Sequence, residues 1–175
     1  MGEDGARVPS PRGSSLWWTS SRDDERRAVS CWLAQAHPIS HQVHEEWLRH
    51  GVALLPLGRH FDAIRVPAAR IHAALGTDDP ATVTADLADR LHGPVIRDTR
   101  SGERPYYVLV APAAEWDGDG AEERLSAGTY LGVPRLGPLS TAAAWTVPPK
   151  HAGDLCDPAR LRAVLALADG VEVPE

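Results

Sequence analysis

The sequence of 175 residues contains little cysteine and no long apolar run. Cys31 and Cys156 are the only two cysteines and lie far apart, which favours a reduced, buried pair over a disulfide. No segment approaches the ~18 consecutive apolar residues of a membrane span. The N-terminus also has no basic region leading into an apolar one, as a secretory signal would. We therefore expect a cytoplasmic protein with no membrane partner.

Net positive charge is also lacking. The chain has 18 basic and 24 acidic residues, a net charge of −6, and Lys150 is its only lysine. Such a balance disfavours a protein that coats nucleic acid by neutralising phosphates. It leaves open a local basic groove built from arginine.

Hydrophobic residues make up 43% of the chain, an ordinary value for a globular protein, so one domain with a real core is expected. Residues 1–20 are rich in turn-forming residues and lack periodicity, which predicts a disordered leader. We assign residues 21–170 to a single domain and residues 171–175 to a tail. The N-terminal third holds four of the six tryptophans, a density that suits either a core or the surface for a protein partner: Trp17, Trp18, Trp32 and Trp47.

Apolar periodicity and capping residues predict five helices. The first starts at about Asp23, and the second runs from about Ser40 to His50 with Gly51 as its C-cap. A short helix spans Ala68–Leu75. The last two helices each begin with an Asp cap followed by Pro, at residues 79–80 and 157–158.

Short apolar runs between these helices predict strands. Val52–Leu57 and Phe61–Val66 form a first pair joined by a turn, and Pro94–Arg97 and Tyr106–Val110 form a hairpin. Two further strands are expected at Thr129–Val133 and Trp145–Val147. Pairs of this kind, without strict alternation of strand and helix, favour the α+β class.

Four of these segments together resemble the N-terminal domain of bifunctional DNA primase/polymerases, a branch of the archaeo-eukaryotic primase superfamily. The resemblance covers about half of the chain. Its segments follow the family's order: Val52–Pro67, which contains Gly58-Arg59-His60-Phe61-Asp62; Gly93–Val110, which contains Ser101-Gly102; Gly128–Pro134; and Trp145–Pro149. The resemblance implies an RRM-like antiparallel or mixed sheet with helices packed on it, two N-terminal helices and one C-terminal helix.

Active members of this family are similar in using paired carboxylates to hold two divalent metals, Mg²⁺ or Mn²⁺, for nucleotidyl transfer. Asp62 is the only acid of its strand and is the candidate catalytic and metal-binding residue, but Ile64 or Arg65 stands where a second acid is expected. Tyr106 and Tyr107 occupy the region of the expected histidine. The alternative interpretation of Asp62 is a solvated strand residue or a turn acceptor.

A phosphate site could survive without the chemistry, because arginine forks suit phosphate oxygens. The candidates in the two loops beside the predicted strands are Arg59, His60, Arg97, Arg100, Ser101 and Arg104. The alternative is that these arginines are ordinary exposed residues.

Two other groups of residues have simpler explanations. His37, His41 and His44 lack a further zinc ligand at a usual spacing and are interpreted as surface histidines. The segment 117–120 starts like a calcium loop and then departs from the pattern, so it is interpreted as an acidic turn.

Three hypotheses remain. The leading one is a non-catalytic primase/polymerase-like domain that binds a nucleotide or nucleic acid, or acts as an accessory protein. The others are an active but divergent nucleotidyltransferase that uses Asp62, and a pure protein-interaction module.

Overall fold

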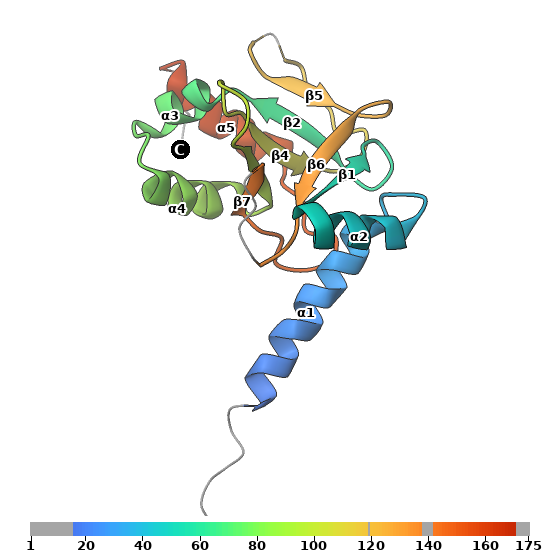
Figure 1. The fold of residues 1–175 in the computed structure, drawn as a ribbon. Coiled ribbons are helices and arrows are strands. Elements are labelled where there is room, and N and C mark those ends of the chain that lie inside the picture. Colours follow the sequence, from blue (N-terminus) through green and yellow to red (C-terminus); the bar gives the residue numbers. More distant parts are fainter. Residues whose placement is uncertain (1–15, 119, 138–141, 171–175) are drawn as a thin grey trace, which may run out of the picture.

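The computed structural model describes residues 16–118, 120–137 and 142–170, with side chains from residue 21 onward. It combines helices with antiparallel strands (Figure 1). The helices are α1 (Leu16–Ala34), α2 (Ser40–His50), α3 (Ala68–Leu75), α4 (Pro80–Leu91) and α5 (Pro158–Ala168). The strands are β1 (Val52–Pro56), β2 (Asp62–Val66), β3 (Val95–Asp98), β4 (Tyr106–Val110), β5 (Glu123–Leu125), β6 (Tyr130–Pro134) and β7 (Ala143–Val147).

The strands form two sheets. A five-stranded sheet has the order β5-β2-β4-β3-β7, and β1 pairs with β6 in a separate two-stranded ribbon. All of the strand pairs in these sheets are antiparallel. The predicted α+β class, with helices packed on an antiparallel sheet, two helices before it and one after it, is confirmed.

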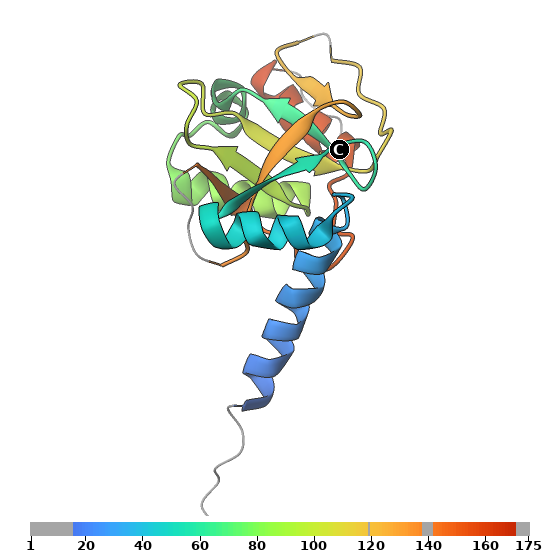
Figure 2. The ribbon, with the colours of Figure 1, turned by 45° about the vertical axis from the view of Figure 1, so that its right-hand side comes forward.

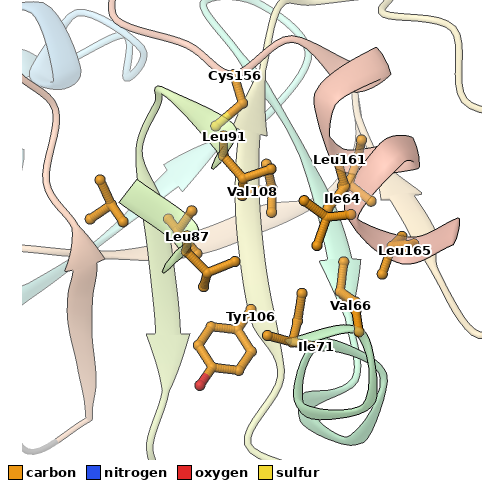
Figure 3. Close-up of a cluster of buried hydrophobic side chains, with 14 of the residues drawn as sticks. Ile64, Val66, Ile71, Leu87, Leu91, Tyr106, Val108, Cys156, Leu161 and Leu165 are labelled. Carbon is orange, nitrogen blue, oxygen red and sulfur yellow. The ribbon is translucent and has the colours of Figure 1, made fainter. Parts of the chain in front are cut away.

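The five-stranded sheet carries a core on each face, because successive side chains of a strand point to opposite sides. On one face, Ile64 and Val66 of β2 pack against α3, α4 and α5, as Figure 3 shows. On the other face, Ala63 of β2 belongs to a second cluster with the inner residues of β1 and β6 and with α1 and α2. The sheet is therefore the middle layer of the molecule.

Local signals set the ends of several helices as expected. The Asp79 carboxylate accepts a hydrogen bond from the Thr82 amide at 2.9 Å, and the Asp157 carboxylate accepts one from Ala159 at 2.9 Å. Gly51 ends α2 in the left-handed conformation, with its amide bonded to the carbonyl of Trp47. These contacts satisfy backbone groups that a helix end otherwise leaves unpaired.

The predicted pairing of the first two strands is wrong. β1 lies in the ribbon and β2 lies in the five-stranded sheet, although only residues 57–61 separate them. The Gly58 amide bonds to the carbonyl of Phe61, so the connection turns tightly and moves the chain to the other layer. β5 was not predicted. Its first two residues are charged and exposed, so no apolar run indicates a strand there.

Two further expectations need correction. α1 begins at Leu16, so residues 16–20 are helical and do not belong to a disordered leader; no Gly or Pro lies between Gly13 and the end of this helix. Residues 1–15 and 171–175 of the predicted leader and tail lie outside the described residues. Both cysteines are free, but only Cys156 is buried, and Cys31 is exposed on α1.

Only the C-terminal part of α1 packs against the domain. Val29, Leu33 and Ala34 are buried, whereas all residues from 21 to 28 are exposed. Two views at 45° show the N-terminal half of this helix projecting away from the rest of the molecule (Figures 1 and 2).

Candidate functional site

Asp62 starts β2 and is completely buried. Its Oδ1 accepts a hydrogen bond from the Ser126 hydroxyl at 3.1 Å. Its Oδ2 accepts one from the Ala113 amide at 3.2 Å and one from Arg124 Nη1 at 3.4 Å. Arg124 in turn donates to the carbonyl of Ala114 at 3.0 Å. The carboxylate therefore ties β2 to the segments on both sides of β5.

This environment is that of a structural carboxylate, because three donors occupy its two oxygens and one donor carries the opposite charge. Asp62 is therefore neither a solvated strand residue nor a simple turn acceptor. Within residues 21–118, 120–137 and 142–170, no three His, Cys, Asp or Glu side chains are grouped so as to hold a metal. The His37, His41 and His44 set is included in that finding.

The two loops that carry the predicted phosphate residues lie at opposite ends of the five-stranded sheet. Arg59 and His60 precede Asp62, which pairs with Val110 at the end of β4. Arg97 pairs with Tyr106 at the start of β4. Since a five-residue strand is about 13 Å long, the predicted convergence of the two groups is wrong.

The candidate residues of the β3–β4 hairpin make separate contacts. The Arg97 guanidinium stacks over Tyr106, 5.5 Å from the ring centre, and its buried Nε has no partner among the described residues. The amides of Arg100 and Ser101 both donate to the Asp98 carboxylate and so close the turn. Arg104 is exposed and adopts a positive φ of 45°. These side chains do not form one phosphate site.

A different group of basic residues does converge. A cleft of about 440 Å³ lies between α1 and the segments around β6 and β7. We call it the basic cleft. It is lined by Arg22, Glu25, Arg26 and Val29 of α1, by Pro134–Gly137, by Ala143–Trp145 and by Pro148–Lys150.

Charge in the basic cleft is unbalanced. Arg22, Arg26, Arg135 and Lys150 face a single acid, Glu25, and none of these five has an ion pair within the part of the chain that the structure describes. Grouping unpaired cations in a concave surface raises the local potential for anions. The cleft is therefore suited to an anionic ligand.

The cleft also has a fixed aromatic wall. Trp145 is half-buried, and its indole N–H donates to the carbonyl of Pro134 at 2.9 Å, which holds the ring. The Arg26 side chain extends to Gly137, in the segment between β6 and β7. Its Nη1 lies 3.6 Å from the position that a Cβ atom would occupy on this glycine. An indole beside arginine forks can contact the ring of a ligand while the arginines contact its acidic oxygens.

Sequence reasoning missed this cleft because its walls come from segments more than 100 residues apart. Two signals were present. Arg22 and Arg26 are four apart and so share one helix face, and Lys150 is the only lysine of the chain. Nothing in the sequence brings these two features together.

A second concave region lies between α5 and residues 116–118 and 120–122, and its Arg70, Glu122 and Asp169 pair with one another. Arg70 contacts Glu122 and Asp169, each at 2.7 Å, and Arg162 stacks over Trp116 at 5.0 Å. Hydrogen bonds with Asp169 and Glu122 raise the pKa of Arg70, and the bond from Arg70 lowers the pKa of Asp169. We interpret this network as a support for the loop and not as a ligand site.

No protein-family model, curated protein or solved structure shows a significant match to this chain. In the described residues, no helix is both long enough and apolar enough to span a bilayer.

Proposed function

We propose that this protein is a non-catalytic primase/polymerase-like domain that binds a nucleotide in its basic cleft. The observation that carries the proposal is that four basic side chains without ion-pair partners among the described residues line one cleft together with Trp145. Phosphate oxygens match the arginine forks, and a base ring matches the indole. The resemblance to primase/polymerase domains supports the choice of a nucleotide among anionic ligands.

The state of Asp62 supports the non-catalytic part of the proposal. A metal ligand in nucleotidyl transfer needs free carboxylate oxygens beside further acids. Both oxygens of Asp62 instead bind Ser126, Ala113 and Arg124, inside the fold. Freeing this carboxylate would break the side-chain contacts that tie β2 to the segments around β5, in addition to their backbone pairing.

The size of the cleft favours a single nucleotide over a long strand. A volume of about 440 Å³ falls within the range of roughly 300–1,000 Å³ that is usual for small-molecule sites. The net charge of −6 also opposes binding along an extended phosphate backbone. A strand would therefore be held, at most, by one terminal nucleotide.

Calorimetric titration with dNTP and NTP, each with and without Mn²⁺, tests the proposal. We expect saturable binding without metal that weakens with salt, and loss of at least tenfold in affinity in Arg26→Glu and Lys150→Glu. Arg90→Glu, on the exposed face of α4 away from the cleft, is the control with the same charge change and should bind like wild type. Arg100→Glu tests the hairpin in place of the cleft. Unchanged binding in both cleft variants would refute the assignment.

The two other hypotheses give different results. Manganese-dependent binding, followed by incorporation of a labelled nucleotide into a primer that Asp62→Asn abolishes, would indicate an active nucleotidyltransferase. The absence of heat and of thermal stabilisation at millimolar nucleotide would leave the interaction module. The projecting half of α1 is the feature that favours this last alternative.

A further inference from the structure

The projecting half of α1 lacks the packing that normally stabilises a helix. Residues 21–28 are exposed, and burial begins only at Val29. An isolated helix shorter than roughly 12–15 residues is marginal in water, because most helix stability in proteins comes from packing. Among the described side chains, one ion pair lies within this segment, Asp24–Arg27 at 3.8 Å; both side chains are more than two-thirds exposed, so it stabilises the helix little. This half of α1 therefore suits a partner that covers it.

The order of charges along the segment suggests what the partner is. Asp23, Asp24 and Glu25 are followed directly by Arg26 and Arg27. In two antiparallel copies related by a two-fold axis beside residue 25, Asp23 of each copy lies at the level of Arg27 of the other. The same operation places Asp24 at the level of Arg26. A parallel pair would instead bring like charges together at all five positions, whereas the antiparallel pair does so only at Glu25, on the axis.

A groove beside the same face of α1 could receive the second helix. This α1–α2 groove, of about 590 Å³, is lined by Asp23, Arg26, Arg27, Ser30 and Cys31 of α1, by His44, Trp47 and Leu48 of α2, and by Arg135 and Leu136. Leu48 is 72% exposed, and the only acid of the groove is Asp23. A mostly cationic groove with an exposed leucine matches a helix that carries three successive acids.

The helix geometry makes the arrangement reciprocal. At 1.5 Å per residue, an antiparallel partner centred on residue 25 brings its residues 19–27, which include the three acids, to the level of residues 23–31, the stretch of α1 that lines the groove. Each copy then gives one helix and receives one, so the contact closes on itself as a two-fold dimer and leaves no open site for further copies.

We propose that the protein forms a two-fold homodimer in which the projecting half of α1 from each copy lies antiparallel to that of the other, along the α1–α2 groove, with Asp23 paired to Arg27 of the second copy. The proposal does not depend on nucleotide binding. Asp23 and Arg27, which carry it, do not line the basic cleft, whereas Arg26, Arg135 and Leu136 line both the cleft and the α1–α2 groove.

Sedimentation velocity of the full chain over a concentration series, with charge-exchange variants, tests this dimer. Wild type should approach twice the 18.9 kDa of one chain as concentration rises. Asp23→Arg alone and Arg27→Asp alone should each weaken self-association at least tenfold, because each makes residues 23 and 27 alike in charge. An equimolar mixture of these two variants should associate, and the double variant D23R/R27D should dimerise like wild type.

Asp89→Arg, an exposed acid of α4, is the control for a charge change elsewhere. Circular dichroism of each variant reports loss of helix, so failure to fold is distinguished from failure to associate. A wild-type chain that stays monomeric at every concentration would overturn the proposal. So would a dimer that the single variants do not weaken, or single variants whose mixture and double exchange fail to restore association. Dimerisation with no nucleotide binding would overturn only the function proposed for the cleft.

Discussion

Replacing Asp62 by alanine should damage the fold and should not act selectively on a ligand. The side chain is 0% exposed and accepts hydrogen bonds from Ser126, Ala113 and Arg124 at 3.1–3.4 Å. Hydrogen bonds to a charged group contribute about 1.5–3 kcal/mol each in the strongest cases. The Arg124 bond is discounted, because its side chain is 34% exposed and water replaces the lost partner.

The two remaining bonds and the small cavity give a loss of roughly 3 kcal/mol in the free energy of unfolding for Asp62→Ala. In a domain of this size, such a loss lowers the midpoint of thermal unfolding by about 6–12 °C. Asp62→Asn keeps an acceptor oxygen and most of the volume, but it loses the charge and turns an amide NH₂ toward one of the donors. We expect roughly half the effect of the alanine variant.

Urea unfolding followed by tryptophan fluorescence, with thermal unfolding by circular dichroism, measures both variants. Asp78→Ala, an exposed acid without a partner among the described residues, is the control and should change stability by less than about 0.5 kcal/mol. If Asp62→Ala were as stable as this control, the structural role of the carboxylate would be refuted. If Mn²⁺ stabilised wild type and not Asp62→Asn, the residue would be a metal ligand after all.

Two further predictions concern reactivity and pH. Burial raises the pKa of the Cys156 thiol to about 12, and Asp154 adds to this effect, whereas Cys31 is exposed on the single chain. Ellman's reagent at pH 8, at a protein concentration low enough to keep the chain monomeric, should therefore label one thiol in the folded chain and two in urea. Rapid labelling of two thiols in the folded chain would contradict the burial of Cys156. The pKa of Asp169 is lowered by its hydrogen bonds from Arg70. The contribution of this contact to stability is therefore complete above the unfolded pKa of about 4 and is lost as pH falls below it. The difference in melting temperature between wild type and Asp169→Asn should shrink toward zero from pH 6 to pH 2.5, and a constant difference would refute the contact.

Local signals were enough for most of the secondary structure. The Asp-Pro pairs at 79–80 and 157–158 and the glycine at 51 act within one helical turn, so their effect does not depend on the rest of the chain. The β3–β4 hairpin is local as well and forms as predicted. Local signals do not predict which strands pair when they are far apart in the sequence. β1 was therefore predicted to pair with β2, although it pairs with β6.

The candidate site was harder to predict from the sequence than the fold. The arginines chosen for a phosphate site lie beside opposite ends of β4, that of the first loop near Val110 and those of the hairpin near Tyr106. Asp62 was identified as unusual, since it is the one acid in an apolar strand. Its role depended on Ser126 and Arg124, more than 60 residues away, which supply its hydrogen bonds.

The sequence by itself determined that this chain has an ordinary core, an α+β pattern, capped helices and no apolar run long enough to cross a membrane. These properties depend on composition and on interactions between residues that are near neighbours in the chain. Only the tertiary structure decided that the Asp62 carboxylate is buried and engaged, that Arg26 and Lys150 meet in one cleft, and that half of α1 projects from the domain. The physical reason is that burial, charge pairing and exposure depend on which distant segments pack together, and one short connection at residues 57–61 sent β1 and β2 into different layers.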